Sequence, residues 1–268
     1  VISADGQYVA FVSYATNLGV TGLNSTSGWG QVYRWHRTSG VIELVTPNAS
    51  EDAGATYNSI NPSISGDGNR ISFHSFSDNL IAGINDVNGV LWSGQDVYVR
   101  DMSTDTTMLV SRSSSNPNQT ANSHSDGQRI SRDGSRVVYR STATDVQAGV
   151  TDLNRGDWDL VVFELATQTN SYVVTQTTEA SSGNSGSFRT DRSLSADGRY
   201  EVFSSDASDL VSGDINQTTD VFLRDIVLGT TTLISRSLSG VSANNSSVQG
   251  VISADGQYVA FVSYATNL

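Results

Sequence analysis

The sequence predicts an all-β protein built from four copies of a four-stranded unit, and three observations lead to this prediction. Asp-Gly turns recur 58 to 66 residues apart, at Asp5, Asp67, Asp133, Asp197 and Asp255. The letters after each turn align without gaps and place an aromatic residue at the same point, at Phe11, Phe73, Tyr139 and Phe203. Runs such as "YVAFV" are apolar on both faces, which is typical of strands covered from both sides.

Each unit is expected to contain four strands in a fixed order. A short strand ending in Ser precedes the Asp-Gly pair, where Gly accepts the positive φ of a tight turn. The second strand carries the aromatic residue. A polar loop of roughly ten residues leads to a third strand such as "DVYVRD" or "DVFLRD", and a short turn leads to a fourth such as "TTLISR". A further pair, Asp126-Gly127, falls outside the series and is expected to be a local turn.

Four-stranded units held between neighbours are the blades of a β-propeller. We predict blades near residues 1–58, 59–124, 125–190 and 191–250, so that 250 residues supply four blades. Four is at the small end of the propeller range. The sequence leaves open whether these blades close into a ring or continue as an open spiral.

The repeats "SADGQYVAF" and "SADGRYEVFSS", with their partner "DVFLRD", resemble TolB-type β-propeller repeats, relatives of the tryptophan-aspartate propellers. The resemblance covers all four repeats and implies the β-propeller fold. It does not imply one function, because such propellers serve as periplasmic scaffolds, peptidase gating domains and surface proteins. Loops such as "VSGDINQTTDVFLRD" resemble those of large secreted bacterial repeat proteins, which implies an extracellular or cell-surface location.

Residues 1–18 and 251–268 have the same sequence, VISADGQYVAFVSYATNL. The internal repeats agree at only a minority of positions, so one ancient duplication does not explain both degrees of likeness. We favour a 250-residue unit, 1–250, repeated head to tail, in which 251–268 supplies the first two strands of the next identical unit. The alternatives are a deliberately duplicated strand pair and a strand-exchange segment that replaces the first copy.

Charge and composition exclude several classes of partner and site. The formal net charge is −12, all fifteen basic residues are Arg, and cysteine is absent. A chain this acidic is expected to repel nucleic acid and anionic membranes. Without cysteine, neither a disulfide nor a thiolate metal site is possible. No apolar run approaches the roughly 18 residues of a membrane helix, so membrane insertion is not expected.

Alternating Asp and Asn in the loop between the second and third strands predict Ca²⁺ sites, because they aim several hard oxygens at one point. The predicted ligands are Asp214, Asn216 and Asp220 in the fourth unit, Asp152, Asn154, Asp157 and Asp159 in the third, and Asp86, Asn88 and Asp96 in the second. The first unit offers only Asn24 and Gln31, so its site is expected to be degenerate. The competing interpretation is structural, since Asp and Asn side chains also stabilise turns.

No motif predicts catalysis. The chain has neither a Gly-x-Ser-x-Gly nucleophile elbow nor a cysteine, so we do not expect an enzyme. The expected function is structural: a repeat module of a long secreted or cell-surface protein that self-associates into a fibre, sheath or adhesin stalk. The alternative is a ligand-binding propeller that recognises a protein or a glycan at its rim or axial channel.

Overall fold

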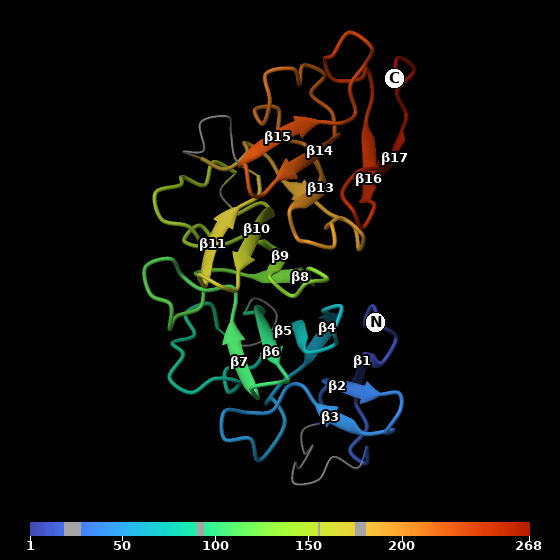
Figure 1. Ribbon diagram of the computed structural model, residues 1–268. Helices are drawn as coiled ribbons and strands as arrows, with labels where there is room; N and C mark the ends of the chain where they lie inside the picture. Colours follow the sequence, from blue (N-terminus) through green and yellow to red (C-terminus); the bar gives the residue numbers. More distant parts are fainter. Residues whose placement is uncertain (19–27, 90–93, 155, 175–180) are drawn as a thin grey trace.

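The computed structural model describes residues 1–18, 28–89, 94–154, 156–174 and 181–268. Within these ranges the regular elements are seventeen β-strands, and the described chain contains no α-helix. Consequently, no helix among these residues has the length and apolar character needed to cross a membrane. The predicted all-β class is confirmed (Figure 1).

The strands form five antiparallel sheets, and each sheet is made of strands that follow one another in the sequence. The first contains β1 (Tyr8–Ser13), β2 (Gln31–His36) and β3 (Ile42–Leu44). The second contains β4 (Ser59–Ile64), β5 (Arg70–Ser75), β6 (Asp96–Asp101) and β7 (Thr106–Leu109). The third contains β8 (Ser125–Ile130), β9 (Arg136–Ser141), β10 (Asp159–Glu164) and β11 (Thr169–Tyr172). The fourth contains β12 (Ser187–Phe188), β13 (Tyr200–Ser205), β14 (Asp220–Asp225) and β15 (Thr230–Leu233), and the fifth contains β16 (Ser247–Ile252) and β17 (Val259–Ser263).

Two local expectations need correction. The loop between the second and third strands of a unit is longer than expected and covers residues 76–95, 142–158 and 206–219 in the three four-stranded sheets. It is longer because it crosses to the neighbouring sheet and bonds there. The Asp126-Gly127 pair is not a separate turn. It lies inside β8 at a shift of register, where Gly127 has a φ of 61° and the strand bulges.

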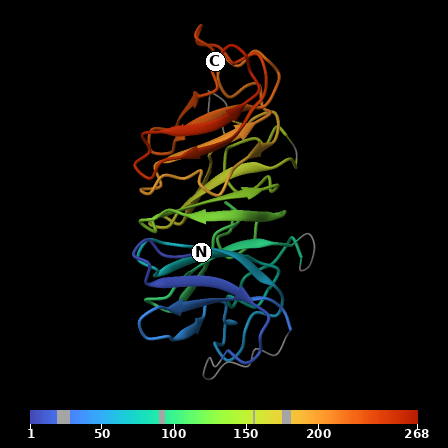
Figure 2. The ribbon, with the colours of Figure 1, turned by 90° about the vertical axis from the view of Figure 1, so that its right-hand side faces the viewer.

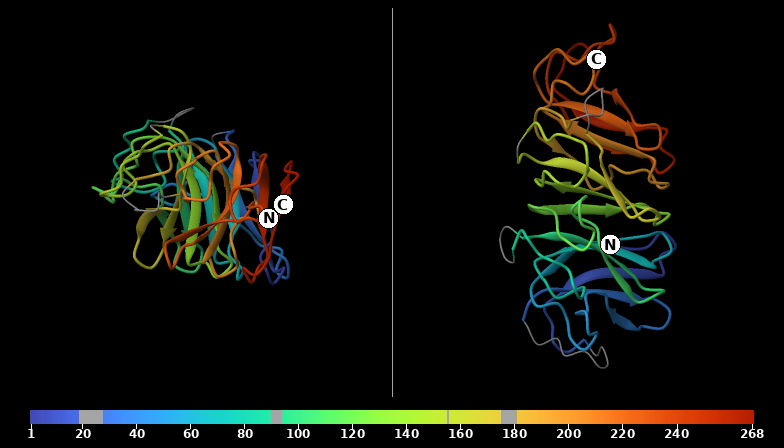
Figure 3. Two further views of the ribbon diagram at one scale, coloured as in Figure 1. Left: turned by 90° about the horizontal axis from the view of Figure 1, so that it is seen from above. Right: turned by 90° about the vertical axis from the view of Figure 1, so that its left-hand side faces the viewer.

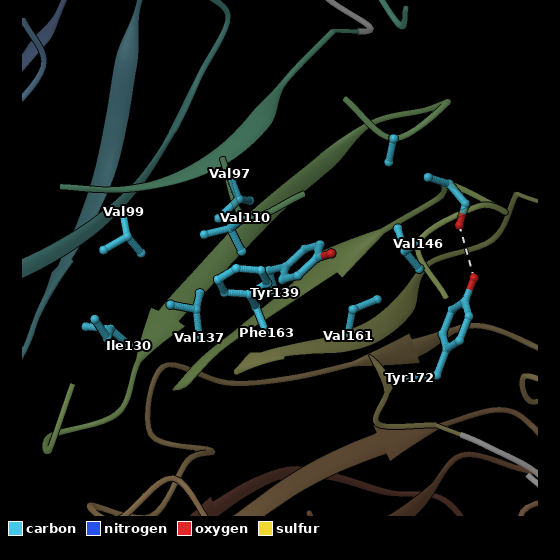
Figure 4. Close-up of a cluster of buried hydrophobic side chains, with 12 residues drawn as sticks. Val97, Val99, Val110, Ile130, Val137, Tyr139, Val146, Val161, Phe163 and Tyr172 are labelled. Atoms are coloured by element: carbon cyan, nitrogen blue, oxygen red, sulfur yellow. Dashed lines mark hydrogen bonds between the residues drawn. The ribbon is translucent and has the colours of Figure 1, made fainter. Parts of the chain in front are cut away.

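The sheets stack face to face, and the apolar core lies in layers between them. Figure 4 shows one layer, in which Val97 of the second sheet packs beside Tyr139 and Phe163 of the third. At the edge of this layer the Tyr172 hydroxyl donates a hydrogen bond to the Ala143 carbonyl oxygen (3.2 Å). Burying each such side chain stabilises the fold by about 1.5–3 kcal/mol, so neighbouring sheets hold one another in place.

The stack runs in one direction along the sequence. Figures 2 and 3 show the first sheet at one end and the fifth sheet at the other. Successive Asp-Gly turns are joined by backbone hydrogen bonds, which we call the turn column. It consists of Ala4 N to Gly66 O (3.0 Å), Gly66 N to Arg132 O (2.7 Å), Asp133 N to Ala196 O (3.1 Å) and Ala196 N to Ala254 O (2.9 Å).

Candidate functional site

Three carboxylates occupy the same buried position in successive sheets. Asp96, Asp159 and Asp220 each begin the third strand of their sheet, and their exposed fractions are 2%, 1% and 0%. A strand covered on both faces leaves no route to water for its first residue. Each of these carboxylates therefore needs its hydrogen-bond donors from the loop that precedes it and from the neighbouring strand.

The fourth unit has the most completely described loop. The Ser235 hydroxyl donates to Asp220 Oδ1 (2.5 Å), but Asp220 Oδ2 has no hydrogen-bond donor, and neither has Asp214 Oδ1. Asn216 lies beside this pair; its Nδ2 donates to Ala243 O, and its Oδ1 accepts from Thr218 N. Burial and the neighbouring Asp220 charge raise the pKa of Asp214 to about 6. Burial also raises the pKa of Asp220.

The third unit repeats this arrangement with one difference. Asn154 Nδ2 donates to Asp159 Oδ1 (3.1 Å), while Asp159 Oδ2 is buried without a donor. Tyr172 pairs with Val161 as Leu233 pairs with Phe222, so Val174 occupies the position that Ser235 has in the fourth unit. Valine has no hydroxyl, so Asp159 receives no hydrogen bond from this position. Burial and the Asp152 charge raise the pKa of Asp159 to about 8. The predicted ligand Asp157 is exposed at the rim of the loop.

In the second unit Asp96 Oδ1 accepts from the Ser111 hydroxyl (2.8 Å) and from Asn88 Nδ2 (3.4 Å). Asp86 folds the start of the loop, because its Oδ1 accepts from the backbone N–H groups of Asn88 and Gly89. Burial raises the pKa of Asp96 well above its usual range, and the Asp86 charge adds to the rise. The structure thus brings together the predicted ligands of this unit.

Each loop also reaches across to the segment that precedes the next sheet. The amide groups of Asn88, Asn154 and Asn216 donate to the backbone carbonyl oxygens of Ser123, Ser185 and Ala243, respectively. The hydroxyls of Thr120, Ser182 and Ser242 accept from the backbone N–H groups of Val87, Leu153 and Ile215. Each carboxylate site therefore lies at the seam between two sheets.

The first unit has Gln31 in place of the buried Asp. Its Oε1 accepts from the Thr46 hydroxyl (2.8 Å), and its Nε2 donates to the carbonyl oxygens of Ala55 (3.1 Å) and Tyr57 (3.4 Å). A neutral amide thus binds the carbonyl oxygens of the seam directly. This agrees with the expected degeneracy of the first site, although Asn24 lies outside the described residues.

The hydroxyl partners of these carboxylates, and the carbonyl oxygens that accept from the loop amides, were not identified from the sequence. Ser111 and Ser235 carry a weak signal, the repeated "LVS" and "LIS" after the third strand, whereas backbone carbonyls carry none. In the described ranges no group of three or more His, Cys, Asp or Glu side chains gathers. A cation at these seams would therefore need amide and carbonyl oxygens in addition to its carboxylates.

Two clefts lie at successive seams near the outer strands. A cleft of about 340 Å³ between the third and fourth sheets is lined by Ser171, Tyr172 and Arg224 among others. A cleft of about 400 Å³ between the second and third sheets is lined by Arg112 and Asn170 among others. Gln147 lines both clefts, and neither lining includes a carboxylate of the acidic loops.

No protein-family model matches the chain, and no curated protein matches it. Similar solved structures include TolB from Acinetobacter baumannii, with 15% identity and a TM-score of 0.46 over 99% of this chain and 53% of that one. A TolB-type protein from Agrobacterium tumefaciens has 18% identity and a TM-score of 0.47 over 97% of this chain and 73% of that one. The acylaminoacyl peptidase of Pyrococcus horikoshii has 12% identity and a TM-score of 0.50 over 98% of this chain and 35% of that one.

These likenesses concern the fold alone. The neighbours include TolB proteins, the group that the repeat motif predicted. The chain spans about half the length of TolB from Acinetobacter baumannii. The neighbours also include a peptidase.

Proposed function

We propose that this chain is a structural repeat module, in which 250-residue units of four blades continue head to tail as one open spiral. The proposed setting is a secreted or cell-surface protein that forms a fibre, sheath or adhesin stalk. The extracellular part of the proposal rests on the resemblance of the loops to those of large secreted repeat proteins. A non-catalytic role belongs to the same proposal, and recognition of a protein or a glycan stays the alternative prediction.

One observation carries the proposal: two identical segments bury opposite faces. In the first copy Ala10 is fully buried against the second sheet, whereas the matching Ala260 is exposed. In the second copy Ile252 is 9% exposed because it packs against the fourth sheet, whereas the matching Ile2 is 62% exposed. A copy inside an array would bury both faces, as the internal sheets do.

Hydrogen bonds support the same arrangement. Within a sheet, a serine of the first strand pairs with a serine of the second strand. Examples are Ser59 with Ser75 and Ser247 with Ser263, each at 2.8 Å between the hydroxyl oxygens. Ser13 matches Ser263, so a preceding copy's serine at position 247 fits beside Ser13 in the same way. The turn column can continue likewise, because Ala254 matches Ala4.

A truncation experiment tests the proposal. Residues 19–268 lack β1, so the edge of β2 is free to pair with a strand of the β1 sequence, and β17 has that sequence. Pairing between molecules would extend the stack without end. We expect 19–268 to form concentration-dependent linear oligomers in sedimentation velocity, and filaments in electron micrographs.

Two further truncations serve as controls. Residues 1–250 lack the donor segment and 19–250 lack both copies, so each is expected to stay monomeric. If 19–268 instead forms a folded monomer in which the β2 amides are protected from hydrogen exchange more strongly than in 19–250, β17 has closed onto β2 of its own chain. That outcome would favour a closed ring and contradict the open array.

A further inference from the structure

We infer that Asp214, Asn216 and Asp220 form a Ca²⁺ site that joins the fourth sheet to the fifth. The loops that end at Asp159 and Asp96 hold its counterparts at the two preceding seams. This inference does not rest on the proposed array, because all the residues that carry it lie within one chain. On this inference the acidic loops link neighbouring sheets through a bound ion, in addition to forming turns.

The first argument is the buried oxygens that lack hydrogen-bond donors. Asp220 is fully buried and Asp214 is 8% exposed, yet one carboxylate oxygen of each has no hydrogen-bond donor. Leaving a charged oxygen buried and unbonded is strongly unfavourable. The same defect recurs at Asp159 Oδ2, at the preceding seam. A cation between the two carboxylates satisfies both orphan oxygens at once.

The second argument is the substitution at the first seam. There Gln31 presents an amide N–H₂ group to the carbonyl oxygens of Ala55 and Tyr57. In the fourth unit Ala243 matches Ala55, and a carboxylate replaces the amide. A carboxylate cannot donate to a carbonyl oxygen. In the fourth unit Asn216 Nδ2 supplies the N–H donor to this carbonyl oxygen, so the acidic pair Asp214 and Asp220 gained there is left with oxygens that a cation can bind.

The chemistry of the donors selects the ion. The seam offers carboxylate, amide, hydroxyl and backbone carbonyl oxygens. Ca²⁺ accepts six to eight oxygen ligands in flexible geometry, with water completing the shell. Mg²⁺ demands a near-ideal octahedron and keeps most of its water. The mixed, partly backbone donor set therefore fits Ca²⁺ better.

The test is calorimetric titration of the chelator-treated chain with CaCl₂ and, separately, with MgCl₂ at pH 7.5. We expect saturable Ca²⁺ binding, weaker Mg²⁺ binding, and a melting temperature raised by roughly 5–10 °C when Ca²⁺ is about a hundredfold above Kd. Asp220→Asn is expected to remove at least one equivalent of bound Ca²⁺ and to reduce this rise. If Asp220→Asn does not fold, as judged by circular dichroism, Asp214→Asn is used in its place.

Asp105→Asn is the matched control, because it removes the same charge from an exposed position in the turn between β6 and β7, outside the acidic loops. It is expected to bind Ca²⁺ with unchanged stoichiometry. The inference is overturned if the chain shows no saturable binding and no change in melting temperature. It is also overturned if Asp220→Asn binds as many ions as the unmodified chain, or if Ca²⁺ and Mg²⁺ act equally.

Discussion

A single imidazole joins the second and third sheets at the residue scale. His74 is buried in β5, and its Nδ1 donates to Gln128 Oε1 of β8 (3.0 Å). Gln128 Nε2 in turn donates to the Asn61 carbonyl oxygen (2.6 Å). Burial lowers the pKa of His74 below its ordinary value of 6.5, although the hydrogen bond that His74 donates to Gln128 opposes the shift.

This buried histidine predicts a loss of stability in acid. Because the folded chain binds the His74 proton less readily than the unfolded chain, its contribution is complete above pH 6.5 and falls as the pH drops through that value. We expect the urea midpoint to fall further between pH 7.5 and 5.5 in the unmodified chain than in His74→Gln.

The comparison must be between the two chains, because other groups titrate in the same window. The raised pKa values of Asp159 and Asp214 act in the opposite sense, since each carboxyl is penalised in its charged form and gains stability as the pH falls. Asp159 and Asp214 contribute equally in the unmodified chain and in His74→Gln, so their effects cancel when the two changes in urea midpoint are compared. Equal acid sensitivity in both chains would show that His74 is not the responsible group.

Contacts between turns set the spacing of the sheets at the element scale. Gly68 has a φ of 74°, and a Cβ atom added there would lie 2.2 Å from the Tyr8 ring of the preceding sheet. Gly6 has a similar φ of 67°, but nothing lies within 4 Å of the same position. The two glycines therefore share one backbone conformation and differ only in what packs against them.

This pair separates backbone strain from sheet packing. Gly6→Ala is expected to cost about 1–2 kcal/mol, the usual penalty of a left-handed residue with a side chain. Gly68→Ala is expected to cost roughly 1–3 kcal/mol more, because the tyrosine ring must move. Chemical unfolding of both variants measures the difference. Equal losses would mean that Tyr8 yields without strain.

The repeated strands were predictable because their chemistry is local. Ser65 donates to Asp67 Oδ1 (2.6 Å) within the turn, and the same bond recurs at every Asp-Gly turn of the series. The length of the loops was not predictable, because distant residues hold them. Asn85 N, for example, donates to the Asn118 carbonyl oxygen (2.9 Å). Likewise the sequence indicated the acidic side chains that gather at the seams, but not the hydroxyl of Ser235.

At the scale of the whole molecule, a stack in which each sheet packs on its neighbours makes the stability of the fold depend on the number of copies. Tyr258, Val262 and Tyr264 are exposed on the fifth sheet. A chain of residues 1–250 followed by residues 1–268 would cover this face once. We expect that chain to melt several degrees above the single copy in differential scanning calorimetry. Identical melting temperatures would indicate independent units and contradict the continuous stack.

The unlike faces of the two identical segments have a consequence for growth. One end of the stack offers Val1 and Ile2, and the other offers Tyr258 and Val262, so the two ends cannot join like to like. Any polymer of these sheets therefore has two structurally different ends, one formed by a first sheet and the other by a fifth sheet. A molecule that blocks elongation at one end would leave the opposite end untouched, so length could be regulated from a single side.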